Sequence, residues 1–263
     1  TSAGEGASGF NVRGGGIDQN LVLLDEAPVY NSSHLFGFFS VFNPDAVRDV
    51  KLIKGGIPSR YGGRLSSILD VRMKDGNNKT YAVNGGVGLI FSRLSVEGPI
   101  MKDKASFIIA GRRSYADVLA QPFLNEGLKG AKFYFYDLTL KGNVKLNDNN
   151  RLYISGYSGA DVFNAGFGFS WGNKTASVRW NKIFNKRLFS NLTAYYSNYD
   201  YELGFGEDDG DLGGTFLWTS NIQNWGGKEE MIWYANANNK VSFGAEAIYY
   251  LFDPGKFTGS SNG

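Results

Sequence analysis

The sequence "NVRGGGIDQNLVLLDEAPVY" spans residues 11–30 and places three consecutive glycines between two apolar runs. Such glycines either cradle a phosphate group or form a turn. A phosphate-binding loop needs a strand before the glycines and a helix N-terminus after them, where free amides meet the anion. Here "IDQ" and a Leu-rich, strand-like run follow, with neither GxxxxGK[ST] nor the third glycine of a dinucleotide-binding fingerprint. We therefore interpret Gly14–Gly16 as a hairpin turn, where glycine permits positive φ.

The composition around this stretch favours an extended, all-β protein. Aromatic residues make up 15% of the 263-residue chain, and glycine contributes 36 residues against 6 prolines. The net charge is +2, and charges of both signs are spread along the chain. This distribution gives no reason to expect nucleic acid as a partner. Without cysteine, the chain has neither disulfides nor thiolate metal sites. No stretch approaches the roughly 18 consecutive apolar residues of a membrane helix, whereas a transmembrane barrel has this aromatic, Gly-rich profile.

After about residue 80, short polar clusters alternate with longer Gly- and aromatic-rich segments. The short clusters are "MKDK" at 101–104, "DNN" at 148–150, "NKR" at 185–187 and "NANNK" at 236–240. The longer segments, which we interpret as loops, include "NAGFGFSWGN" at 164–173 and "GEDDGDLGG" at 206–214. An outer-membrane barrel has this organisation, with short periplasmic turns and long external loops.

Between the turns, apolar and polar residues alternate with a period of two. In "DLTLKGNVKL" at 137–146, for example, Leu138 and Leu140 alternate with Thr139 and Lys141. This period puts an apolar set on one face of each strand and a polar set on the other, as in a barrel or in a soluble half-buried sheet. Strand lengths near ten residues and aromatics near strand ends favour the barrel. The pattern predicts about nine strands, near 80–88, 90–99, 105–118, 137–146, 151–162, 174–184, 188–205, 219–235 and 241–252.

The alternation predicts which side chains face lipid and which face the lumen. We expect lipid contact for Leu138, Leu140, Val144, Ala176, Val178, Trp180, Phe243, Ala245 and Ala247. We expect the lumen face to hold Lys141, Asn143, Thr175, Arg179, Ser242 and Glu246.

The region before residue 80 has a different pattern and reads as a small mixed α/β domain. "LVLLDEAPV" reads as a strand, "FNPDAVRDVKLIKGG" as a short helical turn running into a strand, and "GGRLSSILDVRMKDG" as another strand. We predict two domains, at 1–79 and 80–263. The fold class is mainly β: a partial transmembrane antiparallel β-barrel of about nine strands with an N-terminal α/β domain.

The first domain resembles the plug domain of TonB-dependent outer-membrane receptors, particularly those of Bacteroidota. The resemblance lies in "GFNVRGGGIDQNLVLLDEAPVYN" and "FNPDAVRDVKLIKGGIPSRYGGRLSSILDVRMKDG". The matching positions, in order, are Arg13-Gly14, Asp25 to Pro28, Val50 to Ile53, Gly56 to Pro58, Tyr61-Gly62 and Gly63. One departure is Glu26, because the family more often has glycine after the aspartate.

The resemblance implies a barrel of about 22 strands in the bacterial outer membrane, with the plug inside its lumen. It implies import of a scarce ligand by rearrangement of the plug, driven by the partner protein TonB. The ligand would be a small molecule, a glycan or a peptide, and further partners are outer-membrane lipid and a surface lipoprotein. The alternative is a transport-inactive barrel that serves as a scaffold or signalling subunit. Since no TonB box precedes Thr1, we expect an internal segment of a longer receptor, lacking about thirteen further strands.

The resemblance implies that plug loops facing the outside contact the ligand. On this basis the candidate ligand-binding residues are Arg13, Asp18, Tyr30, His34 and Tyr61, although each has a structural alternative in seating the plug against the wall. We expect no cofactor and no metal site, since "EDDGD" at 207–211 lacks the spacing of a calcium loop. No Ser/His/Asp set or acid/base pair is visible, so we expect no enzyme. Arginines confined in a lumen need partners, and we expect them for Arg60, Arg64 or Arg72.

Overall fold

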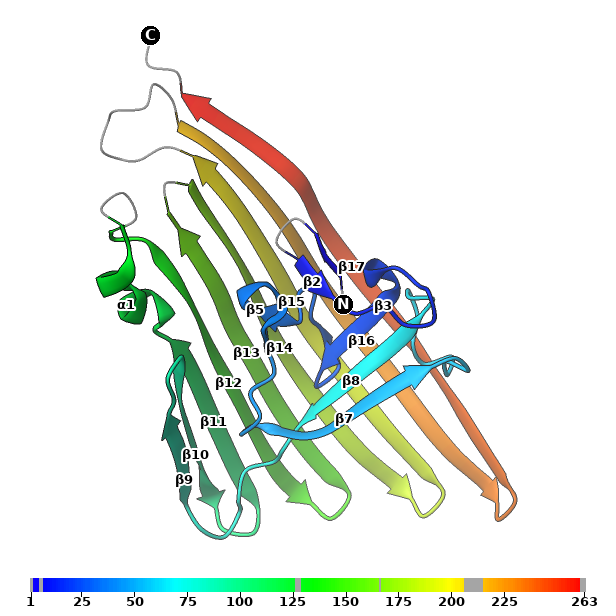
Figure 1. Cartoon of the computed structure of the whole chain (residues 1–263). Helices are drawn as coiled ribbons and strands as arrows, with labels where there is room; N and C mark the ends of the chain where they lie inside the picture. Colours follow the sequence, from blue (N-terminus) through cyan, green and yellow to red (C-terminus); the bar gives the residue numbers. More distant parts are fainter. Residues whose placement is uncertain (1, 5–6, 126–128, 166, 206–214, 261–263) are drawn as a thin grey trace.

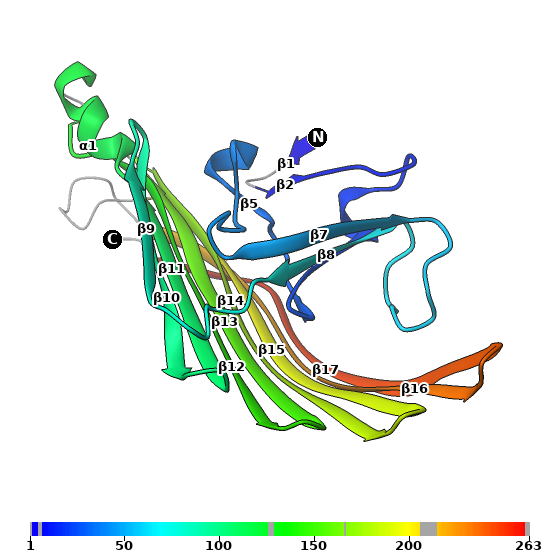
Figure 2. The same cartoon turned by 90° about the horizontal axis from the view of Figure 1, so that it is seen from below.

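The computed structural model describes residues 2–4, 7–125, 129–165, 167–205 and 215–260. Its main feature is one large curved sheet, which we call the wall (Figures 1 and 2). The N-terminal domain, which we call the plug, lies on the concave side of the wall, as Figure 2 shows. Plug and wall are thus two layers, and many charged side chains lie at the surface where the two layers meet.

The wall is a nine-stranded antiparallel sheet in which each strand pairs with its neighbours in sequence, in the order β17 to β9. The predicted number and order of strands are therefore confirmed. The strands are β9 (Ala82–Val87), β10 (Phe91–Met101), β11 (Ala105–Ser114), β12 (Lys132–Asn147), β13 (Asn150–Asn164), β14 (Phe167–Asn185), β15 (Leu188–Phe205), β16 (Thr215–Asn236) and β17 (Asn239–Ser260). β9 and β17 form the two edges of this open sheet.

Three of the tight turns share one local cause. Each begins with an asparagine whose side-chain oxygen accepts the backbone N–H two residues later, and such a bond closes the turn locally. The bonds join Asn149 N to Asn147 Oδ1 at 2.9 Å, Arg187 N to Asn185 Oδ1 at 2.8 Å, and Asn238 N to Asn236 Oδ1 at 3.0 Å. The polar clusters that we interpreted as turns are therefore turns, and they lie together at one end of the wall (Figure 1).

The predicted alternation of faces is present where the plug covers the wall. On β12, Asp137, Thr139 and Lys141 are buried towards the plug, whereas Leu138 and Leu140 point outwards and are 45% and 40% exposed. On β14, Thr175 and Ser177 are buried and Val178 is 44% exposed. The wall therefore has a polar inner face and an apolar outer face, the arrangement of a barrel whose outside meets lipid.

Several of the predicted strand ends are wrong: β12 begins at Lys132 and not at 137, β17 ends at Ser260 and not at 252, and two further ends differ as follows. The segment 164–173 was expected to be a loop, but β14 begins at Phe167 and pairs with both neighbours from there, with Phe163 opposite Phe169. Aromatic rings on adjacent strands stack here and stabilise the pairing, although the glycines between them resemble a loop sequence. The strand predicted at 105–118 ends at Ser114, and a short helix α1 (Ala116–Ala120) follows.

The plug is built around a four-stranded sheet in the order β4-β3-β8-β7, in which β3 and β8 are parallel. Its described elements are β1 (Ser2–Gly4), β2 (Ala7–Gly9), η1 (Ile17–Gln19), β3 (Asn20–Leu24), β4 (Ala27–Pro28), β5 (Ser33–His34), η2 (Leu35–Gly37), β6 (Phe39–Ser40), β7 (Val47–Lys54) and β8 (Ser67–Met73). η1 and η2 are single 3-10 turns. The expected helical turn before β7 is one hydrogen-bonded turn, in which Ala46 N and Val47 N both donate to Asn43 O.

Residues 12–15 form a tight turn, but paired strands do not flank it, so the hairpin expected at Gly14–Gly16 is wrong. Gly15 N donates to Val12 O at 2.9 Å, and the two central residues have positive φ, 51° at Arg13 and 78° at Gly14. The single 3-10 turn η1 follows, and it leads directly into β3. No α-helix N-terminus therefore stands behind these glycines to bind a phosphate.

Apolar residues of the plug sheet pack on both of its faces. On one face, Val22, Leu24, Val71 and Met73 form a cluster that also includes Tyr157 of the wall. On the other face, Leu23 and Ile68 pack against Tyr61. Because Tyr157 belongs to β13, the core of the plug is continuous with the inner face of the wall.

Candidate functional site

The plug rests on the wall along residues 25–31, where three polar side chains of the wall donate hydrogen bonds to plug carbonyl oxygens. The bonds are Ser177 Oγ to Asp25 O at 3.0 Å, Ser197 Oγ to Pro28 O at 2.6 Å, and Asn173 Nδ2 to Asn31 O at 2.8 Å. These donors come from β14 and β15, whose inner faces are polar because polar and apolar residues alternate along each strand. The contact therefore fixes the plug backbone itself and does not depend on flexible plug side chains.

His34 is enclosed between plug and wall. Its Nδ1 lies 2.6 Å from Asp161 Oδ2, its Nε2 lies 3.6 Å from Asp137 Oδ2, and its ring stacks on Phe135. Burial lowers the pKa of His34, but hydrogen bonds to Asp137 and Asp161 and their negative charges outweigh it, so the pKa is raised above its usual value. Arg112 Nε donates to Asp137 at 2.7 Å and completes the network.

Lys141 of β12 forms a second buried network. Its Nζ lies 3.1 Å from Asp25 Oδ2 and 3.1 Å from Asp75 Oδ1, and it donates to Met73 O at 2.9 Å. The Lys141 side chain is 2% exposed, so its charge depends on these three plug groups for compensation. Lys141 thus joins the wall to the C-terminal end of β8 and to the turn after β3.

Glu26 forms a third network through the turn between β3 and β4. Its Oε1 lies 2.9 Å from Arg72 Nη1 and 3.5 Å from Arg179 Nη1, and its Oε2 accepts from Thr193 Oγ1 at 3.2 Å. Burial raises the pKa of Glu26, but Arg72, Arg179 and Lys228 outweigh it, so the pKa is lowered. Glu26 has a φ of 80°, a left-handed conformation that costs a residue with a Cβ about 1–2 kcal/mol.

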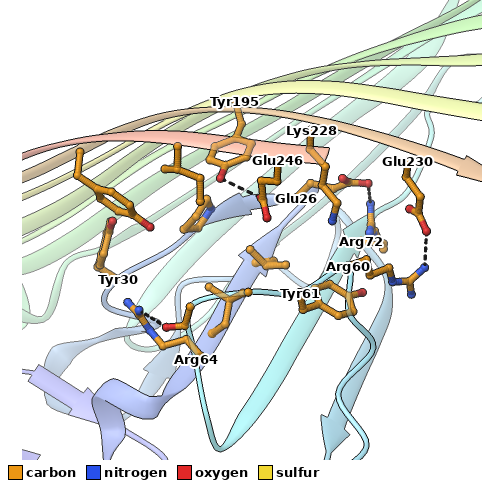
Figure 3. A pocket seen from close by; sticks show the side chains of 17 residues that line it. Glu26, Tyr30, Arg60, Tyr61, Arg64, Arg72, Tyr195, Lys228, Glu230 and Glu246 are labelled. Carbon is orange, nitrogen blue, oxygen red and sulfur yellow. Dashed lines mark hydrogen bonds and ion pairs between the residues drawn. The ribbon is translucent and has the colours of Figure 1, made fainter. Parts of the chain in front are cut away.

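A cavity of about 190 Å³ lies beside this turn, between the plug and β15–β17 (Figure 3). Its charged lining residues are Glu26, Arg60, Arg64, Arg72, Lys228, Glu230 and Glu246. The rings of Tyr30, Tyr61, Tyr195 and Tyr250 also line it. Burial, aided by Tyr250, raises the pKa of Tyr30 to about 12, so its hydroxyl stays protonated at neutral pH. The cavity therefore offers phenol hydroxyls and charges of both signs at the plug–wall boundary.

The structure brings together two of the five predicted ligand-binding residues. Tyr30 and Tyr61 line the cavity, whereas His34 is 1% exposed and serves the buried network. Arg13 and Asp18 are exposed on the plug, away from this cavity. The burial of His34 favours a structural role over ligand contact, the alternative raised from the sequence. The arginine expectation is confirmed, because Arg60 pairs with Glu230 at 3.3 Å and Arg72 with Glu26.

The sequence reasoning missed an aromatic cluster at the end of the wall opposite the tight turns. Phe36 of the plug packs edge-on or tilted against Phe163, Phe169 and Trp171, with ring centroids 5.3 to 6.4 Å apart. Leu35 and Phe36 both have positive φ, 47° and 57°, and Asp161 accepts from Leu35 N at 2.7 Å. The period-two spacing in "FGFSW" at 167–171 was the available signal, because it places alternate rings on one strand face.

Metal ligands and membrane-spanning helices were sought among the described residues. In the described ranges, no group of three His, Cys, Asp or Glu side chains could hold a metal ion. The acidic segment 207–211 lies outside the described residues. No described helix is long and apolar enough to cross a membrane.

Comparison with known proteins gives a family for the plug and a fold for the chain. Residues 1–67 match the model of the TonB-dependent Receptor Plug Domain. No curated protein sequence matches the chain.

Three solved structures illustrate the likeness of fold. The copper transporter OprC superposes with a TM-score of 0.65 at 10% identity, covering 92% of this chain and 39% of its own. The ferric preacinetobactin receptor BauA from Acinetobacter baumannii gives 0.64 at 13% identity, covering 94% and 41%. The siderophore receptor PiuA from the same species gives 0.62 at 15% identity, covering 94% and 40%.

The chain therefore spans about two fifths of the length of these solved structures. The open nine-stranded wall corresponds to part of their barrels, and the plug occupies the concave side of that wall. Residues 1–67 are thus a TonB-dependent receptor plug domain, and the plug and wall together have the fold of TonB-dependent outer-membrane receptors.

Proposed function

We propose that this chain is part of a TonB-dependent transporter of the bacterial outer membrane that imports a scarce ligand by rearranging its plug. The observation that carries the proposal is the two-faced wall: its inner face holds the plug through the buried Asp161 and Lys141, and its outer face is apolar. A barrel in lipid needs an apolar outer face, and a plug that moves needs a polar inner face that water can hydrate. The division of the chain into a plug at 1–79 and a wall at 80–263 belongs to this proposal.

The proposed ligand is a small molecule, glycan or peptide that arrives at the end of the wall opposite the tight turns. The family's orientation makes that end external, and the aromatic cluster around Phe36 lies there. Phe36 is 43% exposed and Phe38 is 83% exposed, so rings are available for contact with a ligand. TonB and outer-membrane lipid are proposed partners, as is a surface lipoprotein, and an origin in Bacteroidota stays a prediction.

An open sheet edge in lipid leaves backbone amides and carbonyls unpaired, at several kcal/mol per group. We therefore propose that β9 and β17 pair with further strands of a larger barrel. This is supported by the length of the solved structures, of which the chain spans about two fifths.

Growth of a deletion strain tests the proposed function. The natural gene is removed, and growth is measured on single limiting nutrients, including iron chelates, vitamins, glycans and peptides, with and without functional TonB. We expect a defect on one nutrient that the natural protein restores only when TonB is present. Normal growth throughout, combined with loss of another outer-membrane complex, would instead support the scaffold alternative.

A further inference from the structure

Two opposite charges lie directly across from each other on the inner face of the wall without forming an ion pair. Lys228 of β16 and Glu246 of β17 are Cα partners in the antiparallel ladder, and both line the cavity. Side chains at such positions have Cβ atoms about 4.5–5.5 Å apart, so a lysine and a glutamate there would ordinarily attract each other into contact. Among the described residues, the cavity contains ion pairs of Arg60 and Arg72 but none between Lys228 and Glu246. Other groups therefore hold the two side chains apart.

The plug supplies the groups that attract Lys228. Its Nζ lies over the ring of Tyr61, 5.2 Å from the ring centroid, where the π face attracts a cation. The negative charge of Glu26, which also belongs to the plug, attracts the same ammonium group. Figure 3 shows Lys228 pointing from the wall towards the plug. The seated plug therefore draws Lys228 away from its cross-strand neighbour.

Glu246 has its partner on the wall. Its Oε1 accepts from the Tyr195 hydroxyl of β15 at 3.4 Å, the contact drawn between these two residues in Figure 3. When the plug moves away from β16 and β17, the contact of Lys228 with Tyr61 is necessarily lost, because one partner belongs to the wall and the other to the plug. Lys228 and Glu246 stay on adjacent paired strands. The released ammonium then has the Glu246 carboxylate as its nearest cross-strand neighbour of opposite charge.

We propose that Lys228 exchanges partners when the plug moves: Tyr61 and Glu26 bind it in the seated plug, and Glu246 binds it once the plug separates from β16 and β17. The Lys228–Glu246 pair forms only in the separated state, so it stabilises that state and makes separation easier. Lys228 and Glu246 are therefore positioning residues. Their meaning for import rests on the proposed function, in which the plug must rearrange.

The partner exchange predicts a distinctive sign for the loss of one charge. Glu246→Gln keeps the size of the side chain and an oxygen that accepts from Tyr195, but the separated state loses its ion pair, so the plug should separate less often. Without a partner exchange, the Glu246 carboxylate only attracts the plug side of the cavity, which has three arginines against one glutamate. Its neutralisation should then make separation easier. The two accounts therefore predict changes in opposite directions.

Thiol labelling of the natural full-length receptor, in detergent and without ligand or TonB, tests the partner exchange. The reporter is Leu23→Cys in a receptor otherwise free of cysteine, because Leu23 lines the cavity and is 6% exposed. A bulky maleimide reaches this position when the plug separates from the wall, so the labelling rate follows the population of the separated state. We expect Glu246→Gln to slow labelling about two- to fivefold. Glu230→Gln, which removes the seated ion pair with Arg60, should accelerate it.

Lys228→Met supplies the matched background. It removes the side chain that changes partners, so Glu246→Gln should no longer slow labelling there. Unchanged or faster labelling in Glu246→Gln alone, or equal slowing with and without Lys228, would overturn the partner exchange. These rates are measured without uptake, so a failed growth experiment and a failed partner exchange remain distinguishable.

Discussion

The plug contacts the wall along two regions that differ in burial. Over β11–β14, in what we call the buried seam, Arg112 donates to Ser40 O of the plug and Lys141 pairs with Asp25 of the plug, with the two wall side chains 4% and 2% exposed. Over β16 and β17, in what we call the open seam, Arg60 meets Glu230 with its side chain 40% exposed, and the cavity separates plug from wall. Similar ion pairs thus lie in different dielectric surroundings.

The difference in burial between the two seams indicates where the plug resists movement. Breaking a buried pair leaves an uncompensated charge and costs several kcal/mol, whereas an exposed pair exchanges its partner for water at little cost. We therefore expect the buried seam to act as the fixed side of the plug and the open seam as the side that separates first. Glu26 lies between them, because it contacts β14 and β15 and also lines the cavity.

The largest effect is expected from Lys141→Met. Removal of the ammonium leaves Asp25 and Asp75 without their shared cation, and the free energy of opening of β8 should fall by about 3–5 kcal/mol. Amide exchange in β8 of the full-length receptor measures it. The control is Lys145→Met on the same strand, whose partner Asp148 is exposed and whose loss should change little. If Lys141→Met and Lys145→Met lowered the opening free energy of β8 equally, burial of the ion pair would not explain the difference between the two seams.

A smaller, pH-dependent effect is expected at His34. Its pKa is raised in the seated plug, so the protonated ring stabilises seating fully below its ordinary value of about 6.5. That contribution is lost as the pH rises through the seated-state pKa. The groups facing His34 are Asp137, Asp161 and Tyr157, with Arg112 behind Asp137.

We expect amide exchange of residues 31–40 to accelerate, beyond its intrinsic pH dependence, when the pH is raised above 6.5 through the seated-state pKa. His34→Gln should abolish this extra dependence, since glutamine does not titrate. An unchanged pH profile in His34→Gln would mean that another group controls seating.

The smallest effect is expected in the open seam. Arg60→Ala removes the contact to Glu230, and the opening free energy of the loop between β7 and β8 should change by about 0–1 kcal/mol. The same loop also loses the stacking of Arg60 on Tyr61, at 4.9 Å from the ring centroid. A loss comparable to that of Lys141→Met would show that the open seam holds the plug as firmly as the buried one.

The wall was predictable from the sequence because its signals are local. Period-two alternation and the Asn-led turns fix the number and order of the strands without any distant contact. Strand ends were harder, since the segment 164–173 reads as a loop by its glycines, and only the pairing of Phe163 with Phe169 shows it to be sheet. The helical turn expected before β7 is present as one hydrogen-bonded turn, and β7 pairs with β8 immediately after it.

Most of the hydrogen-bond and ion-pair networks of the site could not be predicted from the sequence, because they join distant segments of the chain. His34 and Asp161 are 127 residues apart, and Glu26 and Thr193 are 167 apart, so no local spacing encodes either contact. Glu26 was noticed only as a departure from the family pattern. Contact of Arg13, Asp18, Tyr30, His34 and Tyr61 with a ligand stays a prediction, although two of these five line the cavity.

The most direct test of the two-faced wall compares neighbouring residues of β15 in the natural receptor in bilayers. Single cysteines replace Leu192, which is 43% exposed on the outer face, and Asn191, which points inwards, and each carries a fluorescent label. We predict quenching of the label at position 192 by brominated acyl chains and of the label at 191 by aqueous iodide. Equal quenching of both labels by iodide would contradict a membrane barrel with the plug on its polar face.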